Sequence, residues 1–270
     1  MQSFDEWQKE IKTWQNKTTT KLIGKNTILL AEIPSTNNYI KENLQLPTGT
    51  IVIAYQQTQG KGQKNRRWIS NPGGLYLSIK LDMAPLDELS PFWVTAIVAI
   101  SLCKTLEFLH LSPKIKWPND VLIDNKKVAG ILTETIMTNN NITLIIGLGC
   151  NVNNSLDEIM NDFPDLLSKI TSLNDQFGQS RLISFVDILE PTISFIEAKL
   201  LNQNKLFLNE IKTEWLNYSK IENKHVEIMK LDSGTISRGK IIKVTDSGSL
   251  LFKKNSGEIE EITSGDVKVH

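Results

Sequence analysis

Hydrophobic residues recur along the chain with two different spacings. Near its start, Phe4, Trp7, Ile11 and Trp14 lie three or four residues apart, as on the apolar face of an amphipathic helix. We therefore expect a short helix over residues 3–16. From residue 26 onward short apolar runs alternate with polar breaks, which predicts strands at 27–33, 50–57, 74–81, 128–137 and 142–150. Three consecutive asparagines at 139–141 separate the last two runs and predict a hairpin turn.

Longer apolar stretches predict helices. The most apolar one, Phe92 to Leu102, is shorter than the ~20 residues of a membrane span, so we expect a buried helix that runs from Phe92 to Leu109. Residues 183–218 return to helical spacing, with a last segment at 207–216. Proline lacks the N–H that a helix interior requires, so Pro191 is predicted to divide the first part into two helices.

The pattern of the sequence changes after Asn223. Short β runs are separated by Asp-Ser-Gly turns at 232–234 and 246–248, and the runs are HVEIMK, TISRGKIIKV, SLLFKK and EIEEIT. Such a segment suffices for a small SH3-like β-barrel. The whole pattern predicts an α+β fold with a central mixed, mainly antiparallel sheet. We expect three parts: a helical extension (1–25), a main domain (26–222) and the barrel (223–270).

Composition and charge narrow the classes of protein. Lys plus Arg number 30, as do Asp plus Glu, and 40% of the residues are hydrophobic. Zero net charge argues against a chain devoted to nucleic acid, and the apolar content argues against disorder. Cys103 and Cys150 lie in apolar runs without a CxxC motif, so we expect free thiols. The N-terminus has acidic residues and no apolar leader, which predicts a cytoplasmic protein.

The first candidate site is QTQGKGQKNRRW at 57–68, directly after a predicted strand. Gly60 and Gly62 let backbone N–H groups approach an anion, and four cations add positive charge: Lys61, Lys64, Arg66 and Arg67. The window fails the dinucleotide fingerprint, and the chain has no Walker loop, GxSxG elbow or histidine cluster. It indicates a cradle for a polyphosphate or a carboxylate, with a solvated basic loop as the alternative.

Two further windows carry candidate chemistry. In 114–134, Asp120 is suited to hold Mg²⁺ or orient a cation, and Lys127, near Gly130, to neutralise a phosphate or carboxylate oxygen. The alternative is a plain turn before a hairpin. In IIGLGCNVN at 145–153, small residues end an apolar strand, either as simple tapering or as a place where an asparagine amide contacts an adenine edge. Cys150 lacks a nearby histidine, which favours a structural thiol.

Together these windows resemble the biotin protein ligases. The matching motifs are IPSTNNYI at 33–40, the window at 57–68, GGLYLSIKL at 73–81, KWPNDVLIDNKKVAGIL at 116–132 and GLGCNVN at 147–153. The most specific feature is KWPND followed, seven residues after its aspartate, by the lysine of KVAGIL. The resemblance covers residues from about 26 to 270. It implies the class II synthetase-like biotin/lipoate ligase fold with an SH3-like C-terminal barrel, in a monofunctional form without a DNA-binding domain.

The resemblance also implies roles for individual residues. Those expected to bind biotin are Ser35, Thr36, Asn37, Gln57, Gly60, Lys61, Gly62, Gln63, Trp68, Lys127, Gly130 and Gly147. Those expected on the ATP side are Lys116, Asn119, Asp120 and Asn151, with Asp120 also facing Mg²⁺. Catalytic roles are implied for Lys127, Lys61 and Asp120. The chain departs from the family at Gln63, where an arginine is usual.

The activity implied is ATP-dependent formation of biotinyl-5'-AMP, followed by transfer of biotin to a lysine of the biotin carboxyl carrier protein of a carboxylase. The resemblance implies ATP and Mg²⁺ with biotin as substrate, no tightly bound prosthetic group, a monomer or homodimer, and neither a nucleic-acid nor a membrane partner. One alternative is a lipoate or octanoate ligase or transferase. The other is a DNA-binding biotin sensor, which the roughly 25 residues before the main domain are too few to support.

Overall fold

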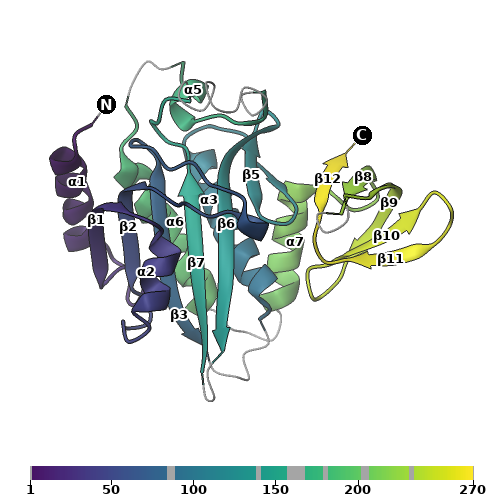
Figure 1. The fold of residues 1–270 in the computed structure, drawn as a ribbon, viewed down its shortest axis with the longest axis horizontal. Coiled ribbons are helices and arrows are strands. Elements are labelled where there is room, and N and C mark those ends of the chain that lie inside the picture. Colours follow the sequence, from purple (N-terminus) through teal and green to yellow (C-terminus); the bar gives the residue numbers. More distant parts are fainter. Residues whose placement is uncertain are drawn as a thin grey trace.

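The structure, a computed structural model, describes residues 2–83, 89–137, 141–156, 168–178, 182–201, 207–230 and 234–269. Its largest element is a seven-stranded sheet with the order β1-β2-β3-β7-β6-β5-β4 (Figure 1). The strands are β1 (Thr27–Ile33), β2 (Ile51–Gln57), β3 (Leu75–Met83), β4 (Lys114–Lys116), β5 (Asp120–Ile123), β6 (Lys126–Met137) and β7 (Ile142–Cys150). Neighbouring strands are antiparallel except β1 and β2, which are parallel. The predicted α+β class and mainly antiparallel sheet are therefore confirmed.

The parallel pair depends on a helix that the hydrophobic pattern did not predict. This helix, α2 (Thr36–Glu42), forms part of the crossover that two parallel strands require. It begins after Ser35, whose side chain caps the first turn. Its sequence TNNYIKE shows too little apolar periodicity to be noticed. Ile40 of α2 packs on Val52 and Ile145, which fixes the helix against one face of the sheet.

Three long helices cover the opposite face: α3 (Pro91–Phe108), α6 (Phe185–Leu201) and α7 (Phe207–Ser219). By length and composition α3 resembles a membrane span, but 72% of it is buried inside the fold, so the predicted buried helix is confirmed. Strand β7 alternates between the two faces. Leu144, Ile146 and Leu148 join the core under the helices, whereas Gly147 and Gly149 lie on the other face of the sheet, where the candidate site is found.

The prediction that Pro191 divides two helices was wrong. The proline lies inside the single helix α6, which continues to Leu201. Residues on both sides of it, including Ile188 and Ile193, are completely buried in the same core. Packing of this apolar face outweighs the one hydrogen bond that proline removes.

The predicted N-terminal helix is confirmed as α1 (Phe4–Lys17). Trp7, Ile11 and Trp14 are buried in the main core, and Figure 1 shows the helix beside β1 at the edge of the sheet. The segment after α1 is tied to α6 by the Glu197 carboxylate, which accepts hydrogen bonds from the backbone N–H groups of residues 21–23. The extension is therefore integrated into the fold.

The C-terminal strands form a second, antiparallel sheet with the order β11-β10-β9-β8-β12. The strands are β8 (His225–Met229), β9 (Ile236–Val244), β10 (Leu250–Lys254), β11 (Ile259–Ile262) and β12 (Asp266–Val269). The turn at 246–248 is confirmed, and β12 was not predicted. The turn at 232–234 lies mostly outside the described residues, as does most of the asparagine turn at 139–141, although β6 and β7 do form the expected hairpin.

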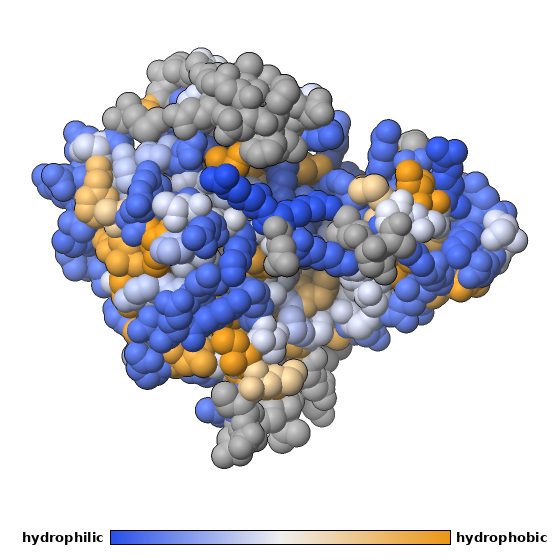
Figure 2. All heavy atoms as spheres, in the orientation of Figure 1, coloured by the Kyte–Doolittle hydropathy of each residue, from blue (hydrophilic) through white to orange (hydrophobic). Residues whose placement is uncertain are grey.

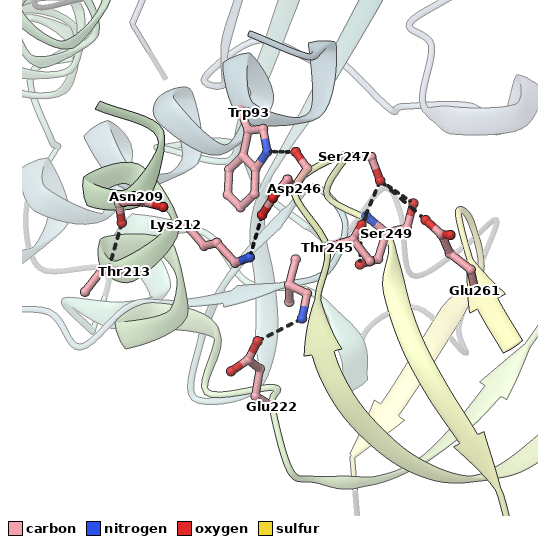
Figure 3. A network of polar contacts seen from close by, with 11 residues as sticks. Trp93, Asn209, Lys212, Thr213, Glu222, Thr245, Asp246, Ser247, Ser249 and Glu261 are labelled. Carbon is pink, nitrogen blue, oxygen red and sulfur yellow. Dashed lines mark hydrogen bonds and ion pairs between the residues drawn. The ribbon is translucent and has the colours of Figure 1, made fainter. Parts of the chain in front are cut away.

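The turn between β9 and β10 attaches this sheet to the rest of the molecule. The Trp93 indole N–H donates to the carbonyl oxygen of Asp246 at 2.6 Å, and that of Trp117 donates to the carbonyl of Gly248 at 3.0 Å. Lys212 of α7 adds an ion pair with the Asp246 carboxylate at 2.9 Å, as Figure 3 shows. Because Trp117 lies between β4 and β5, this docking also positions the segment that carries the KWPND motif.

Candidate active site

One cavity of about 610 Å³ collects the three sequence windows. Figure 2 shows this face of the molecule hollowed near its centre, with mostly hydrophilic residues around the hollow. Every residue predicted for the site lines the cavity except Gly60, namely Ser35, Thr36, Asn37, Gln57, Lys61, Gly62, Gln63, Trp68, Lys116, Asn119, Asp120, Lys127, Gly130, Gly147 and Asn151. The chain thus brings together residues more than a hundred positions apart.

The floor of the cavity is made of glycines on β6 and β7. A Cβ atom at Gly147 would lie 2.5 Å from Asn37 Oδ1, and one at Gly149 would lie 2.6 Å from the Trp68 indole. A Cβ atom at Gly130 would meet both Trp68 and Lys127 at 3.1 Å. Larger residues at these positions would collide with Asn37, Trp68 or Lys127, so the glycines let these cavity-lining side chains lie close against the sheet.

Hydrogen bonds fix the orientation of Gln57 at one end of the cavity. The backbone N–H of Thr36, at the start of α2, donates to Gln57 Oε1 at 2.8 Å. On the other side Gln57 Nε2 donates to the Ser70 hydroxyl at 2.9 Å. Gly60 lies beneath this contact, because a Cβ atom there would come within 2.6 Å of Ser70 Oγ. It supports the site from outside the cavity lining.

The loop at 57–68 closes back on itself beside the cavity. The N–H of Gly62 donates to the carbonyl of Arg66 at 2.7 Å, and the Trp68 N–H donates to the carbonyl of Gly60 at 2.8 Å. Lys61 donates to Asn38 Oδ1 at 3.0 Å. None of the loop's four cations forms an ion pair with a described residue, so their charge is free to attract an anionic ligand.

Two cavity-lining residues, Lys127 and Asp120, form an ion pair. The distance from Lys127 Nζ to Asp120 Oδ1 is 2.6 Å, and the side chains are 28% and 22% exposed. The pairing of β5 with β6 brings the two residues together across the hairpin. The Lys127 ammonium also lies 5.0 Å from the centre of a Trp68 ring, which favours a cation there. The aspartate therefore orients the lysine ammonium, which keeps further N–H donors for a ligand.

The C-terminal sheet contributes a part of the site that the sequence did not reveal. Gly265 and Asp266 line the cavity, and the Asp266 carboxylate lies 2.6 Å from Lys116 Nζ. The predicted nucleotide-side residue Lys116 is thus paired with the C-terminal sheet. Residues 169 and 170 also line the cavity without having been predicted. Of the lining residues that were not predicted, Gly149 could have been found from the sequence. It is the second glycine of GLGCNVN, and the alternation of a strand places it on the same face as the predicted site residue Gly147.

Two predicted asparagines have internal hydrogen bonds. Asn119 is 9% exposed, and its amide donates to the carbonyl of Ile131 at 2.6 Å. Asn151 donates to the carbonyl of Thr171 at 3.1 Å. Both side chains hold neighbouring backbone segments in place around the cavity.

Cys150 is a buried thiol. Burial raises the pKa of Cys150 to about 12, which keeps it protonated and unreactive at neutral pH. The other cysteine, Cys103, is also buried, and burial raises the pKa of its thiol well above the ordinary value. The expectation of free structural thiols is confirmed.

A resident metal centre has no ligand cluster within the described part of the chain, where no three His, Cys, Asp or Glu residues are grouped for one ion. A Mg²⁺ ion that binds together with a nucleotide needs fewer protein ligands. It is usually held by one or two carboxylates together with phosphate oxygens and water. Asp120, whose carboxylate lines the cavity, suits that mode of binding.

Known proteins resemble this chain in sequence and in structure. The sequence profile of the Biotin/lipoate A/B protein ligase family matches residues 29–151. The chain is 32% identical over 256 residues to the Bifunctional ligase/repressor BirA of Bacillus subtilis, a match that covers 93% of this chain and 76% of that protein. The Biotin protein ligase from Aquifex aeolicus in complex with biotin and ATP superposes with a TM-score of 0.73 and 28% identity, covering 91% of this chain and 99% of that one. This chain therefore belongs to the biotin/lipoate A/B protein ligase family.

Proposed function

We propose that the protein is an ATP-dependent biotin protein ligase. It activates biotin to biotinyl-5'-AMP and transfers the biotinyl group to a lysine of a biotin carboxyl carrier protein. The observation that carries the proposal is the cavity of about 610 Å³, which is lined at once by the cationic loop, the Lys127–Asp120 pair and the glycine floor. The similarity to the Aquifex aeolicus enzyme described with biotin and ATP supports the same substrates here.

The first step joins two anions, and the cations of the cavity make this possible. A carboxylate oxygen of biotin attacks the α-phosphorus of ATP, the new P–O bond forms, and the bond to pyrophosphate breaks. Lys127 and Lys61 both line the cavity, so that both can neutralise the oxygens of the carboxylate and the α-phosphate. No protein base is required, because the nucleophile is already ionised.

The second step transfers the biotinyl group to an amine. The uncharged lysine amine of the carrier attacks the carbonyl carbon of the adenylate, AMP leaves, and the nitrogen loses a proton. Until then the mixed anhydride must be kept from water, a role suited to the 57–68 loop, with Gly60 and Gly62, and to the Trp68 ring on the cavity floor. Asp120, paired with Lys127, orients that lysine through both steps.

Mg²⁺ belongs to the proposal as an ion bound with ATP. Asp120 is the residue that would hold it, and the ion would supply further neutralisation of the phosphate charge. The other parts of the proposal are a cytoplasmic location, a monomer or homodimer, no prosthetic group, and the division into residues 1–25, 26–222 and 223–270.

We also infer that the chain does not repress transcription by binding an operator. The apolar face of α1 is buried in the core through Trp7, Ile11 and Trp14, so this face is not available to pack on other helices of a DNA-binding unit. Specific, salt-sensitive retention of promoter DNA by the purified protein would contradict this inference.

Pyrophosphate exchange tests the proposed activity. The protein is incubated with ATP, Mg²⁺ and labelled pyrophosphate, and incorporation of label into ATP is measured with biotin, with lipoate and with neither. We expect exchange with biotin only. Exchange with lipoate but not with biotin would instead identify a lipoate ligase. Mass spectrometry of an added carrier domain then tests the transfer to its lysine.

A further inference from the structure

The Asn37 side chain lies between a carboxylate and a hydroxyl group. Its Nδ2 donates to Glu134 Oε2 at 2.8 Å, with a longer contact to the carbonyl of Leu132 at 3.4 Å. Its Oδ1 accepts a hydrogen bond from Ser78 Oγ. Asn37 lines the cavity and is 4% exposed, whereas Glu134 on β6 is not among the lining residues. Among the described residues, Asn37 is the cavity-lining residue to which Glu134 is hydrogen-bonded.

The carboxylate decides which way the Asn37 amide points. An ionised carboxylate has only acceptor oxygens, so it pairs with the NH₂ end of the amide and repels the carbonyl end. Burial alone would raise the pKa of Glu134, but hydrogen bonds from Lys41 and Asn37 and the charges of Lys41 and Lys61 lower it below its ordinary value. At neutral pH the residue is therefore ionised.

The resulting orientation places an acceptor at the cavity floor. Asn37 Oδ1 lies only 2.5 Å from the position that a Cβ atom of Gly147 would occupy, so it sits directly over the glycine floor. Ser78 uses one lone pair of this oxygen. The second lone pair remains for a donor inside the cavity. If the amide turned over, the same position would present a donor instead.

We propose that Glu134 is a positioning residue, which holds Asn37 Oδ1 toward the cavity so that it accepts a hydrogen bond from an N–H group of the bound ring. The inference rests on the proposed function, because the ureido ring of biotin carries such N–H groups and the dithiolane ring of lipoate does not. Under this proposal, Glu134 contributes to the selection of biotin over lipoate although it contacts neither molecule.

The charge partner of Glu134 provides a matched control. Lys41 lies on α2, and its ammonium is 2.6 Å from Glu134 Oε1, the oxygen that Asn37 does not use. Lys41 is absent from the cavity lining. A Lys41→Met variant therefore removes the ion pair and leaves the hydrogen bond between Glu134 and Asn37 intact.

Steady-state kinetics of pyrophosphate exchange test the proposal. We expect Glu134→Ala to raise the KM for biotin about tenfold, the effect of losing one hydrogen bond to the ligand, with kcat and the KM for ATP within about twofold of wild type. Lys41→Met is expected to keep the wild-type KM for biotin. In an Asn37→Ala background, Glu134→Ala should change this KM less than about twofold, because the group it positions is gone.

The conservative variant supplies a second test. Glu134→Gln offers one acceptor oxygen to two donors, Lys41 Nζ and Asn37 Nδ2, so we expect an intermediate KM for biotin. Adding Lys41→Met removes one donor and should return the KM toward that of wild type. A purely structural role of Glu134 predicts no such rescue. Thermal unfolding of each variant checks that it is folded.

Two results would overturn the inference and leave the proposed function intact. One is an unchanged KM for biotin in Glu134→Ala. The other is an equal increase in KM with and without Asn37. If the wild-type protein uses lipoate and not biotin, the proposed function itself fails. Pyrophosphate exchange of the wild-type protein decides this point before any variant is made.

Discussion

Glu197 provides a direct test of how the N-terminal segment is attached. Its side chain lies on α6 and is buried, with 7% of the residue exposed. One carboxylate oxygen accepts the N–H groups of Leu22 and Ile23, each at 2.7 Å, and the other accepts that of Lys21. Glu197→Gln keeps the shape but replaces one oxygen with an NH₂ group, which cannot accept a hydrogen bond.

The expected loss follows from these contacts. Hydrogen bonds to a charged group contribute about 1.5–3 kcal/mol each, and an unpaired buried N–H costs about 1–3 kcal/mol. The variant keeps one good acceptor and loses at least one bond, so we expect the free energy of unfolding to fall by about 2–4 kcal/mol. Urea titration followed by tryptophan fluorescence measures the change, and hydrogen exchange should show faster exchange at Lys21, Leu22 and Ile23.

The effect should depend on pH with a definite sign. Burial would raise the pKa of Glu197, but the N–H groups of residues 21, 23 and 22 and the charge of Lys25 lower it below the ordinary value. The contribution is therefore fully present above the unfolded pKa of about 4.3 and is lost as pH falls through the lower folded-state pKa. The difference between wild type and variant should shrink over the same range.

An exposed glutamate gives the control. Glu32→Gln, on β1, should change the free energy of unfolding by less than about 0.5 kcal/mol. The reasoning is refuted if Glu197→Gln is equally mild, or if exchange at the three amides stays as slow as in the wild-type protein.

Three further predictions concern the cavity. Lys127→Ala should lower pyrophosphate exchange by at least about 10²-fold with an unchanged circular dichroism spectrum, because a charge-neutralising group is lost, and normal exchange would remove Lys127 from the site. Gln63→Arg should slow release of biotinyl-5'-AMP in a filter-binding assay, since it adds a cation to the lining, whereas unchanged release would indicate that the existing cations suffice. Gly149→Ala places a Cβ 2.6 Å from the Trp68 indole, so displacement of the ring should raise the KM for biotin and alter tryptophan fluorescence; unaltered values of both would contradict the packing described for the floor.

The parts of the fold that follow from hydrophobic spacing could be predicted. The alternation of apolar runs with polar breaks predicted β1, β2, β3, β6 and β7 of the large sheet but not the short strands β4 and β5, and the apolar stripe of Trp7, Ile11 and Trp14 predicted α1. Two predictions failed where tertiary contacts outweigh local preference. The polar helix α2, which was not predicted, is held by its cap and by the packing of its Ile40 on Val52 and Ile145, and Pro191 is tolerated because both halves of α6 pack on one core.

The residues of the candidate site could likewise be predicted only in part. The glycines, lysines and Asp120 lie in motifs that a linear sequence displays. Glu134 and Asp266 are missing from such motifs, because their importance comes from a partner 97 or 150 residues away. The hydrogen bonds of Asn37 and Lys116 could be assigned only after the strands had been placed.

The docking of the C-terminal sheet has a consequence for how the sequence can vary. The indoles of Trp93 and Trp117 meet main-chain carbonyl oxygens, which every amino acid possesses. These two contacts therefore fix the path of the turn and not the identity of its residues, whereas Asp246 is also held by its ion pair with Lys212, and a Cβ atom at Gly248 would lie 2.0 Å from Phe92. The position of the C-terminal sheet thus depends on two tryptophans that lie 153 and 131 residues before the carbonyl groups that they contact.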